Sequence, residues 1–244
     1  MSKCFLAGKI KGMTVADDQM TTADAARMLG VSVRQVRNLV DAGELAAVGR
    51  VGSVLLLDSN SVLRLRERGS QRGRPWAEET TWAAVETLDC GHTSRLNAAQ
   101  RSRLRARLRE MDDEEFVRLA RRRSQVSCYR ASASFLSRLR EHVALTGAAA
   151  VAEDRSVADE FGLATGDRST VDGYVDRNLI RDYEDEFFLV PDRHGNVVLR
   201  GTTSNAVSNQ TASASAIALD LAESLDTRER SAGLRVLAEK LDRL

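Results

Sequence analysis

The sequence of 244 residues predicts a mainly α-helical fold with small β elements. The composition favours helix, because the chain has only two prolines and 5% aromatic residues and is rich in Ala, Leu, Arg and Glu. Several segments combine a capping residue, apolar residues at helical spacing and a terminating glycine. Strand-like apolar runs are short and few.

The first ordered segment predicts two short helices joined by a tight turn. Hydroxyl and carboxylate side chains at positions 21–24 can cap a first helix, in which Ala25 and Ala26 share a face before Gly30 ends it. Ser32 can cap a second helix, and the apolar residues of this helix recur at helical spacing: Val36, Leu39 and Val40.

A β-hairpin and a third helix follow these two helices. Apolar residues at 45–48 and 54–57 flank a glycine-containing basic turn at 49–53, which predicts two short strands around a tight turn. A third helix is expected at 62–68. This order of elements predicts a winged helix-turn-helix over residues 20–70.

The second helix has a polar outer face. With its three apolar residues turned inward, the residues left outside are Arg34, Gln35, Arg37 and Asn38, with Ser32 at the N-terminus. Arg can donate two hydrogen bonds to a guanine edge, Gln and Asn can pair with adenine, and Ser suits a phosphate. Arg50 in the turn between the strands can reach a flanking phosphate or the minor groove. The alternative is that these side chains only solvate a helix face.

Residues 21–45 read TTADAARMLGVSVRQVRNLVDAGEL and resemble the MerR/excisionase-like winged-helix family. The resemblance covers about a fifth of the chain and implies a fold rather than one biological role. It implies that the second helix enters the major groove of double-stranded DNA and that the wing contacts the backbone. The residues that would carry this contact are Arg34, Gln35, Arg37, Asn38 and Arg50.

The rest of the chain predicts further helices and a smaller strand-containing region. A polar, glycine-containing linker at 69–75 marks the clearest boundary. Helices are expected at 76–88 (with Trp82 and Val85 inward), 97–109, 112–123 and 135–145, and two more in 216–244. Residues 187–190 and 196–199 predict a β-hairpin.

Four parts are therefore expected. They are a flexible leader at 1–19, the winged helix-turn-helix at 20–70, a helical region at 71–147, and a small α+β domain with C-terminal helices at 148–244.

Charge is distributed unevenly along the chain. Residues 1–140 hold 25 basic and 16 acidic residues, whereas residues 141–244 hold 11 basic and 19 acidic ones. A basic front half suits a polyanionic partner. Within it, Arg103, Arg105 and Arg107 are candidates for a second phosphate-contacting surface. The alternative is a solvated face that pairs locally with the acidic residues at 112–115.

Other chemistries find little support in the sequence. Three dispersed cysteines argue against a disulfide framework and indicate a reducing cytoplasm, and no apolar run is long enough to span a membrane. Cys90 and His92 lack the partners that a structural zinc site needs, and the acidic residues at 184–186 read as a loop rather than a catalytic pair. We expect no cofactor, no metal and no active site. The alternative, an enzyme with unrecognised chemistry in the C-terminal part, would require a cluster of polar residues in a pocket.

A second resemblance covers scattered segments of the chain. Residues 72–76 (RGRPW), 81–83 (TWA), 171–175 (VDGYV) and 195–200 (GNVVLR) are similar to antitoxins of the AbiEi type. The resemblance implies a repressor of its own operon that accompanies a nucleotidyltransferase toxin. Binding to an inverted-repeat operator would favour a homodimer. The alternative is an excisionase-like recombination or architectural factor, although such proteins are usually small and would leave the acidic half unexplained.

Overall fold

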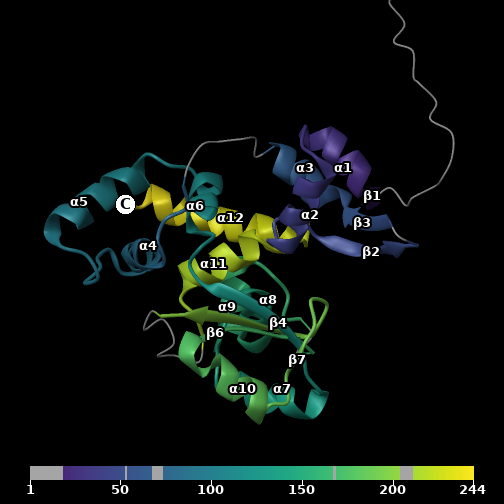
Figure 1. The fold of residues 1–244 in the computed structure, drawn as a ribbon. Helices are drawn as coiled ribbons and strands as arrows, with labels where there is room; N and C mark the ends of the chain where they lie inside the picture. Colours follow the sequence, from purple (N-terminus) through teal and green to yellow (C-terminus); the bar gives the residue numbers. More distant parts are fainter. Residues whose placement is uncertain (1–18, 53, 68–73, 167–168, 204–210) are drawn as a thin grey trace, which may run out of the picture. The chain divides into compact units, whose positions relative to one another are not determined.

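The computed structural model describes residues 19–52, 54–67, 74–166, 169–203 and 211–244. The chain forms two compact units that divide between Arg72 and Gly73 (Figure 1). The expected leader lies, except for residue 19, outside the described residues, as does most of the expected linker.

The first unit is a three-helix, three-stranded fold around a small apolar core. Its sheet has the order β1-β3-β2 and is antiparallel throughout. The helices pack on the core residues Ala25, Ala26, Val36, Leu45, Leu57 and Val62. The elements are β1 (Gln19–Thr21), α1 (Thr22–Leu29), α2 (Val33–Asp41), β2 (Ala47–Val51), β3 (Val54–Asp58) and α3 (Ser59–Glu67). The winged helix-turn-helix expected from the sequence is therefore present.

The second unit is built on a five-stranded mixed sheet. The strand order is β5-β6-β8-β4-β7, in which only β6 and β8 are parallel. The strands are β4 (Gln125–Arg130), β5 (Ala144–Leu145), β6 (Val171–Asp176), β7 (Val190–Pro191) and β8 (Val197–Thr202).

Helices cover both faces of this sheet. Figure 1 shows α7 (Ala133–Arg140) and α10 (Ile180–Glu186) on one side, and α8 (Gly147–Glu153), α9 (Arg155–Phe161) and α11 (Ala214–Ala222) on the other. The remaining helices are α4 (Glu78–Cys90), α5 (Ala98–Arg109), α6 (Asp113–Ala120) and α12 (Thr227–Asp242), with a 3₁₀ turn at Arg177–Leu179. Mainly helical content with small sheets agrees with the fold class that the sequence predicts.

The second unit differs from the expectation in its internal division. No boundary falls at residue 147, because one apolar core joins residues from both sides of it, including Trp82, Phe116, Phe161 and Leu199. Strand β4, from the region expected to be helical, lies inside the same sheet as β6 and β8. The expected regions 71–147 and 148–244 therefore form a single unit.

Two local expectations also change. The hairpin expected over 187–199 does not form, because β4 lies between β7 and β8 and pairs with both. The helix expected over 135–145 ends at Arg140, and Ala144–Leu145 pairs with β6 as an edge strand. Both differences come from strand partners that are distant in sequence.

Candidate nucleic-acid interface

Helix α2 is held in place by its cap and by one buried side chain. The Ser32 hydroxyl accepts a hydrogen bond from the backbone N–H of Gln35 at 3.2 Å, which satisfies one of the free donors at the helix start. Gly30 adopts a left-handed conformation (φ 67°), so the chain can turn between α1 and α2. Val36 is fully buried and fixes which face of α2 points outward.

The outward face of α2 is polar and unpaired. The side chains of Arg34, Gln35, Arg37 and Asn38 are exposed, and among the described residues they form no hydrogen bond or ion pair. Ser32, Arg34, Gln35, Asn38 and Leu39 line one shallow hollow. The structure thus brings together four of the five residues of this helix that the sequence singles out.

Arg37 lies apart from that hollow. Successive residues of an α-helix are rotated by about 100°. This rotation places Gln35 on one flank of Arg34 and Arg37 on the other, with Asn38 almost in line with Arg34. Arg37 is therefore positioned for a phosphate or base beside the surface that the other side chains share.

The hairpin of β2 and β3 forms the wing, and it carries Arg50 next to exposed apolar residues. Arg50 lies opposite Leu55 in the β2–β3 pairing, and its side chain is exposed without a partner among the described residues. Val51 and Val54 flank the tight turn and are 53% and 41% exposed. The sequence predicts Val51 in the turn and Val54 in the second strand, without a role for either in the exposed tip. Their position next to a glycine turn was the available indication that they lie at an exposed tip.

The basic residues of α5 belong to the second unit. Arg103 and Arg105 are exposed and have no side-chain partner in the part of the chain that the structure describes. Arg107 differs, because its guanidinium donates to Glu115 at 2.6 Å. The local pairing that the sequence left as an alternative therefore holds for Arg107, whereas Arg103 and Arg105 keep their charge available.

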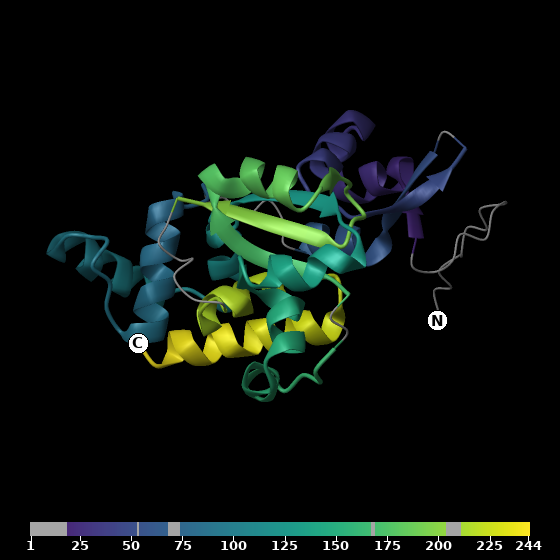
Figure 2. The ribbon, with the colours of Figure 1, turned by 90° about the horizontal axis from the view of Figure 1, so that it is seen from below.

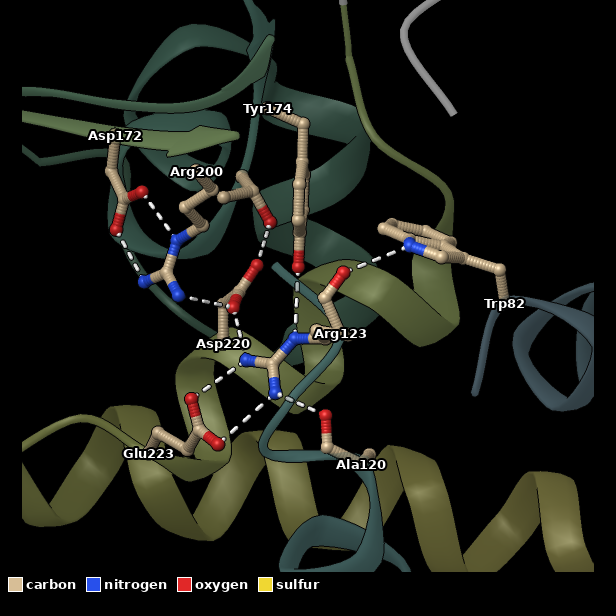
Figure 3. A network of polar contacts seen from close by, with 9 residues as sticks. Trp82, Ala120, Arg123, Asp172, Tyr174, Arg200, Asp220 and Glu223 are labelled. Carbon is tan, nitrogen blue, oxygen red and sulfur yellow. Dashed lines mark hydrogen bonds and ion pairs between the residues drawn. The ribbon is translucent and has the colours of Figure 1, made fainter. Parts of the chain in front are cut away.

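A buried polar network occupies the second unit between the sheet and α11 (Figure 3). The Arg123 side chain, 2% exposed, donates to the Tyr174 hydroxyl at 2.9 Å and to Glu223 at 2.7 Å, and it pairs with Asp220. Asp220 is fully buried and also accepts from Arg200 at 2.8 Å and from Thr146 at 2.6 Å.

Arg200 extends the network to the sheet. Its guanidinium forms a two-pronged pair with Asp172, at 2.7 and 2.8 Å. Such parallel bonds match the planar fork of arginine to a carboxylate. The network therefore ties β6 and β8 to α11 and to the segment after α6.

The two buried aspartates of this network are shifted in opposite directions. Burial raises the pKa of Asp172, against the lowering effect of Arg200. Burial also tends to raise the pKa of Asp220. The nearby charges of Arg200 and Arg123 outweigh this effect, so the pKa of Asp220 is lowered. Opposed carboxylates of this kind occur in catalytic sites and in structural ion networks alike.

The hydrogen-bonding groups of the network satisfy one another. Among the described residues, the only buried side-chain nitrogen or oxygen atoms without a partner are Asp89 Oδ2 and Arg177 Nε, and neither belongs to it. Because the donors and acceptors are matched to one another, the network offers a ligand no buried group in need of a partner. The polar groups of this cluster are thus engaged with one another.

In the described part of the chain, no group of three or more His, Cys, Asp and Glu side chains is placed to hold a metal ion. His92 Nδ1 contacts the carbonyl oxygen of Cys90 at 3.1 Å. None of the described helices is long and apolar enough to cross a membrane.

Comparison with known proteins identifies the first unit. A family model described as a helix-turn-helix domain matches residues 20–70. No curated protein and no solved structure matches the chain significantly. The matched range covers the capped helix α2 and the wing described above. Residues 20–70 are thus a DNA-binding helix-turn-helix domain, and the chain carries the DNA-binding element of a regulator.

Proposed function

We propose that the protein is a sequence-specific transcriptional repressor that binds double-stranded DNA upstream of its own gene. The observation that carries this proposal is the outer face of α2, where Arg34, Gln35 and Asn38 are exposed and unpaired around one hollow. Arginine and amide side chains are the groups that discriminate base edges in the major groove. Their freedom from internal partners leaves these donors available for base edges.

The finer role is that of an antitoxin. The resemblance to AbiEi-type antitoxins supports a non-enzymatic protein that represses its own operon in the cytoplasm and accompanies a nucleotidyltransferase toxin. Two copies on an inverted repeat would place two α2 helices about one DNA turn apart. The closed bonding of the Arg123 network agrees with a structural rather than a catalytic role for the second unit.

The first experiment is a footprint and gel-shift titration on the DNA upstream of the gene, at about 50 and 200 mM salt. Salt-sensitive protection of an inverted repeat is the expected result. Equal affinity for this DNA and for random duplex would overturn the autorepressor proposal and favour an excisionase-like or architectural role. Co-expression with the neighbouring gene product, scored by growth, tests the antitoxin role separately.

Variants of Arg34 test the base contact itself. Arg34→Ala should weaken operator binding by about 1–3 kcal/mol, or roughly 5- to 150-fold, and relax the base preference at one position. Arg34→Lys keeps the charge but cannot form the two-pronged contact. Loss of specificity in both variants supports base readout, whereas full rescue by lysine would reassign Arg34 to a phosphate.

A further inference from the structure

Helix α5 has an unusual concentration of uncompensated charge. Its twelve residues, AAQRSRLRARLR, include five arginines and no acidic residue. Arginines spaced four residues apart repel one another, and each such pair costs a helix about 0.2–0.5 kcal/mol. Arg101, Arg105 and Arg109 form one such series, and Arg103 and Arg107 another.

Two buried leucines fix the orientation of this helix. Leu104 and Leu108 are its buried residues, so the opposite side faces solvent. At about 100° per residue, the middle of the solvent side consists of small exposed residues: Ala99, Ser102 and Ala106. Arg103 lies along one edge of this stripe and Arg105 along the other. Both views of the molecule place α5 at the periphery of the second unit (Figures 1 and 2).

The arginines of α5 differ in their partners. Arg101 donates to the carbonyl oxygen of Leu96 at 2.6 Å, and Arg109 donates to the main-chain oxygen of Leu244 at 2.6 Å. Arg107 pairs with Glu115, as described above. Arg103 and Arg105 are left without a partner among the described residues. Four arginines on other helices of this unit do face acids, in the pairs Arg138–Glu186, Arg140–Glu153, Arg230–Glu114 and Arg235–Glu239. Arg181 and Arg228 are also exposed without a side-chain partner among the described residues, but each lies on a helix that also carries acidic residues.

We propose that α5 is a second DNA-binding surface, which contacts the phosphate backbone of duplex DNA without reading its sequence. The small central stripe allows close approach of a sugar-phosphate backbone, and the two edges present guanidinium groups to phosphates. The solvent side has no large apolar side chain, which a protein-binding hot spot would require. It also has no aromatic side chain on which unpaired bases could stack, so a single strand is a poorer match than a duplex. This surface adds to the operator readout by α2 and does not depend on it.

The test uses the full chain and a labelled random-sequence duplex of about 30 base pairs, long enough to take up several phosphate contacts. Arg103→Gln with Arg105→Gln should lower the affinity for this probe and reduce the slope of log affinity against log salt by about two. The matched control is Arg181→Gln with Arg228→Gln, which removes the same charge from two exposed arginines of this unit that have no side-chain partner among the described residues. A slope equal to that of the control would overturn the proposal.

Two further variants separate this proposal from the proposed function. Arg103→Lys with Arg105→Lys should keep the slope of the unsubstituted protein, because phosphate contacts need charge rather than a planar fork. Combining Arg34→Ala with Asn38→Ala should remove operator preference and leave binding to the random duplex dependent on α5. If this pair of substitutions abolished random-duplex binding as well, α5 would not be an independent surface. Circular dichroism of each variant checks that the total helical content is unchanged.

Discussion

Replacing Arg123 with methionine should destabilise the second unit severely. The guanidinium is buried and bonds to Tyr174, Asp220 and Glu223, whereas methionine is shorter, uncharged and can replace only the aliphatic part of the side chain. Asp220 would keep Arg200 and Thr146, and Glu223 can turn to solvent because its side chain is already 32% exposed. The fully buried Tyr174 hydroxyl would lose the guanidinium as its partner.

The magnitude follows from these contacts. Removing one member of a buried ion pair costs about 3–5 kcal/mol, and an unsatisfied buried hydroxyl costs about 1–3 kcal/mol. Because Asp220 and Glu223 both retain alternatives, we expect a total near the lower part of this range, about 4 kcal/mol. For a unit of this size, that corresponds to a fall in Tm of roughly 10 °C.

Tryptophan fluorescence during urea unfolding measures this loss directly. The two tryptophans of the chain, Trp76 and Trp82, both lie in the second unit, and Trp82 Nε1 donates to the carbonyl oxygen of Arg123 at 3.0 Å. Arg122→Met is the matched control, since Arg122 is exposed and without a side-chain partner among the described residues. If the Arg123 and Arg122 variants differed in free energy of unfolding by less than about 0.5 kcal/mol, the network would not support the fold.

Three further predictions concern single positions. Ser32→Ala should remove the α2 cap and destabilise that helix by about 1 kcal/mol, measured as faster amide exchange at its N-terminus. Gly233→Ala should cost about 1–3 kcal/mol in urea unfolding, because a Cβ would lie 2.5 Å from the Ala218 carbonyl oxygen; Gly166→Ala, with open space around it, is the control and should be neutral. Glu78→Gln should make the free energy of unfolding less dependent on pH at acidic pH. Burial tends to raise the pKa of Glu78, but hydrogen bonds, of which that from Thr202 has the largest effect, outweigh burial and lower the pKa. The stability that the Glu78 carboxylate contributes is therefore complete above about pH 4.3, its pKa in the unfolded chain, and is lost as pH falls through the lower pKa of the folded state. If the urea midpoint of the variant fell as steeply with decreasing pH as that of the unsubstituted protein, this assignment would be wrong.

The first unit could be predicted because its determinants are local. The cap at Ser32, the left-handed turn at Gly30 and the buried Val36 all lie within seven consecutive residues. Such short-range features specify helix boundaries directly. The outward residues of α2 could be predicted for the same reason, because the apolar residues that face the core determine which residues lie on the opposite, exposed face. The coordinates add the hollow itself, which Ser32, Arg34, Gln35, Asn38 and Leu39 line and Arg37 does not.

The second unit could not be predicted in the same way. Strand β4 has the sequence QVSCYR, which lacks a clean alternation of apolar and polar residues, and its partner β8 lies about 70 residues later. The apolar runs before and after residues 191–195 suggested a hairpin because sequential strands usually pair. Insertion of β4 between them is a tertiary event, which no pattern within 187–199 could reveal.

The partners of the arginines, rather than their number, distinguish their roles in this chain. Arg121, Arg122 and Arg123 are consecutive, and the sequence gives no reason to separate them. Arg123 alone is buried, because Asp220 and Glu223, from a helix and its cap about 100 residues later, face it. It therefore counts toward the basic charge of the front half without being available to DNA. By the same reasoning, Arg103 and Arg105 gain significance because they share a helix that has no acidic residue and no acid in the described part of the chain is placed against them. Arg34 likewise has no acidic partner among the described residues. Arginines without acidic partners on both units predict that α5 binds the phosphate backbone of DNA and that α2 contacts the base edges.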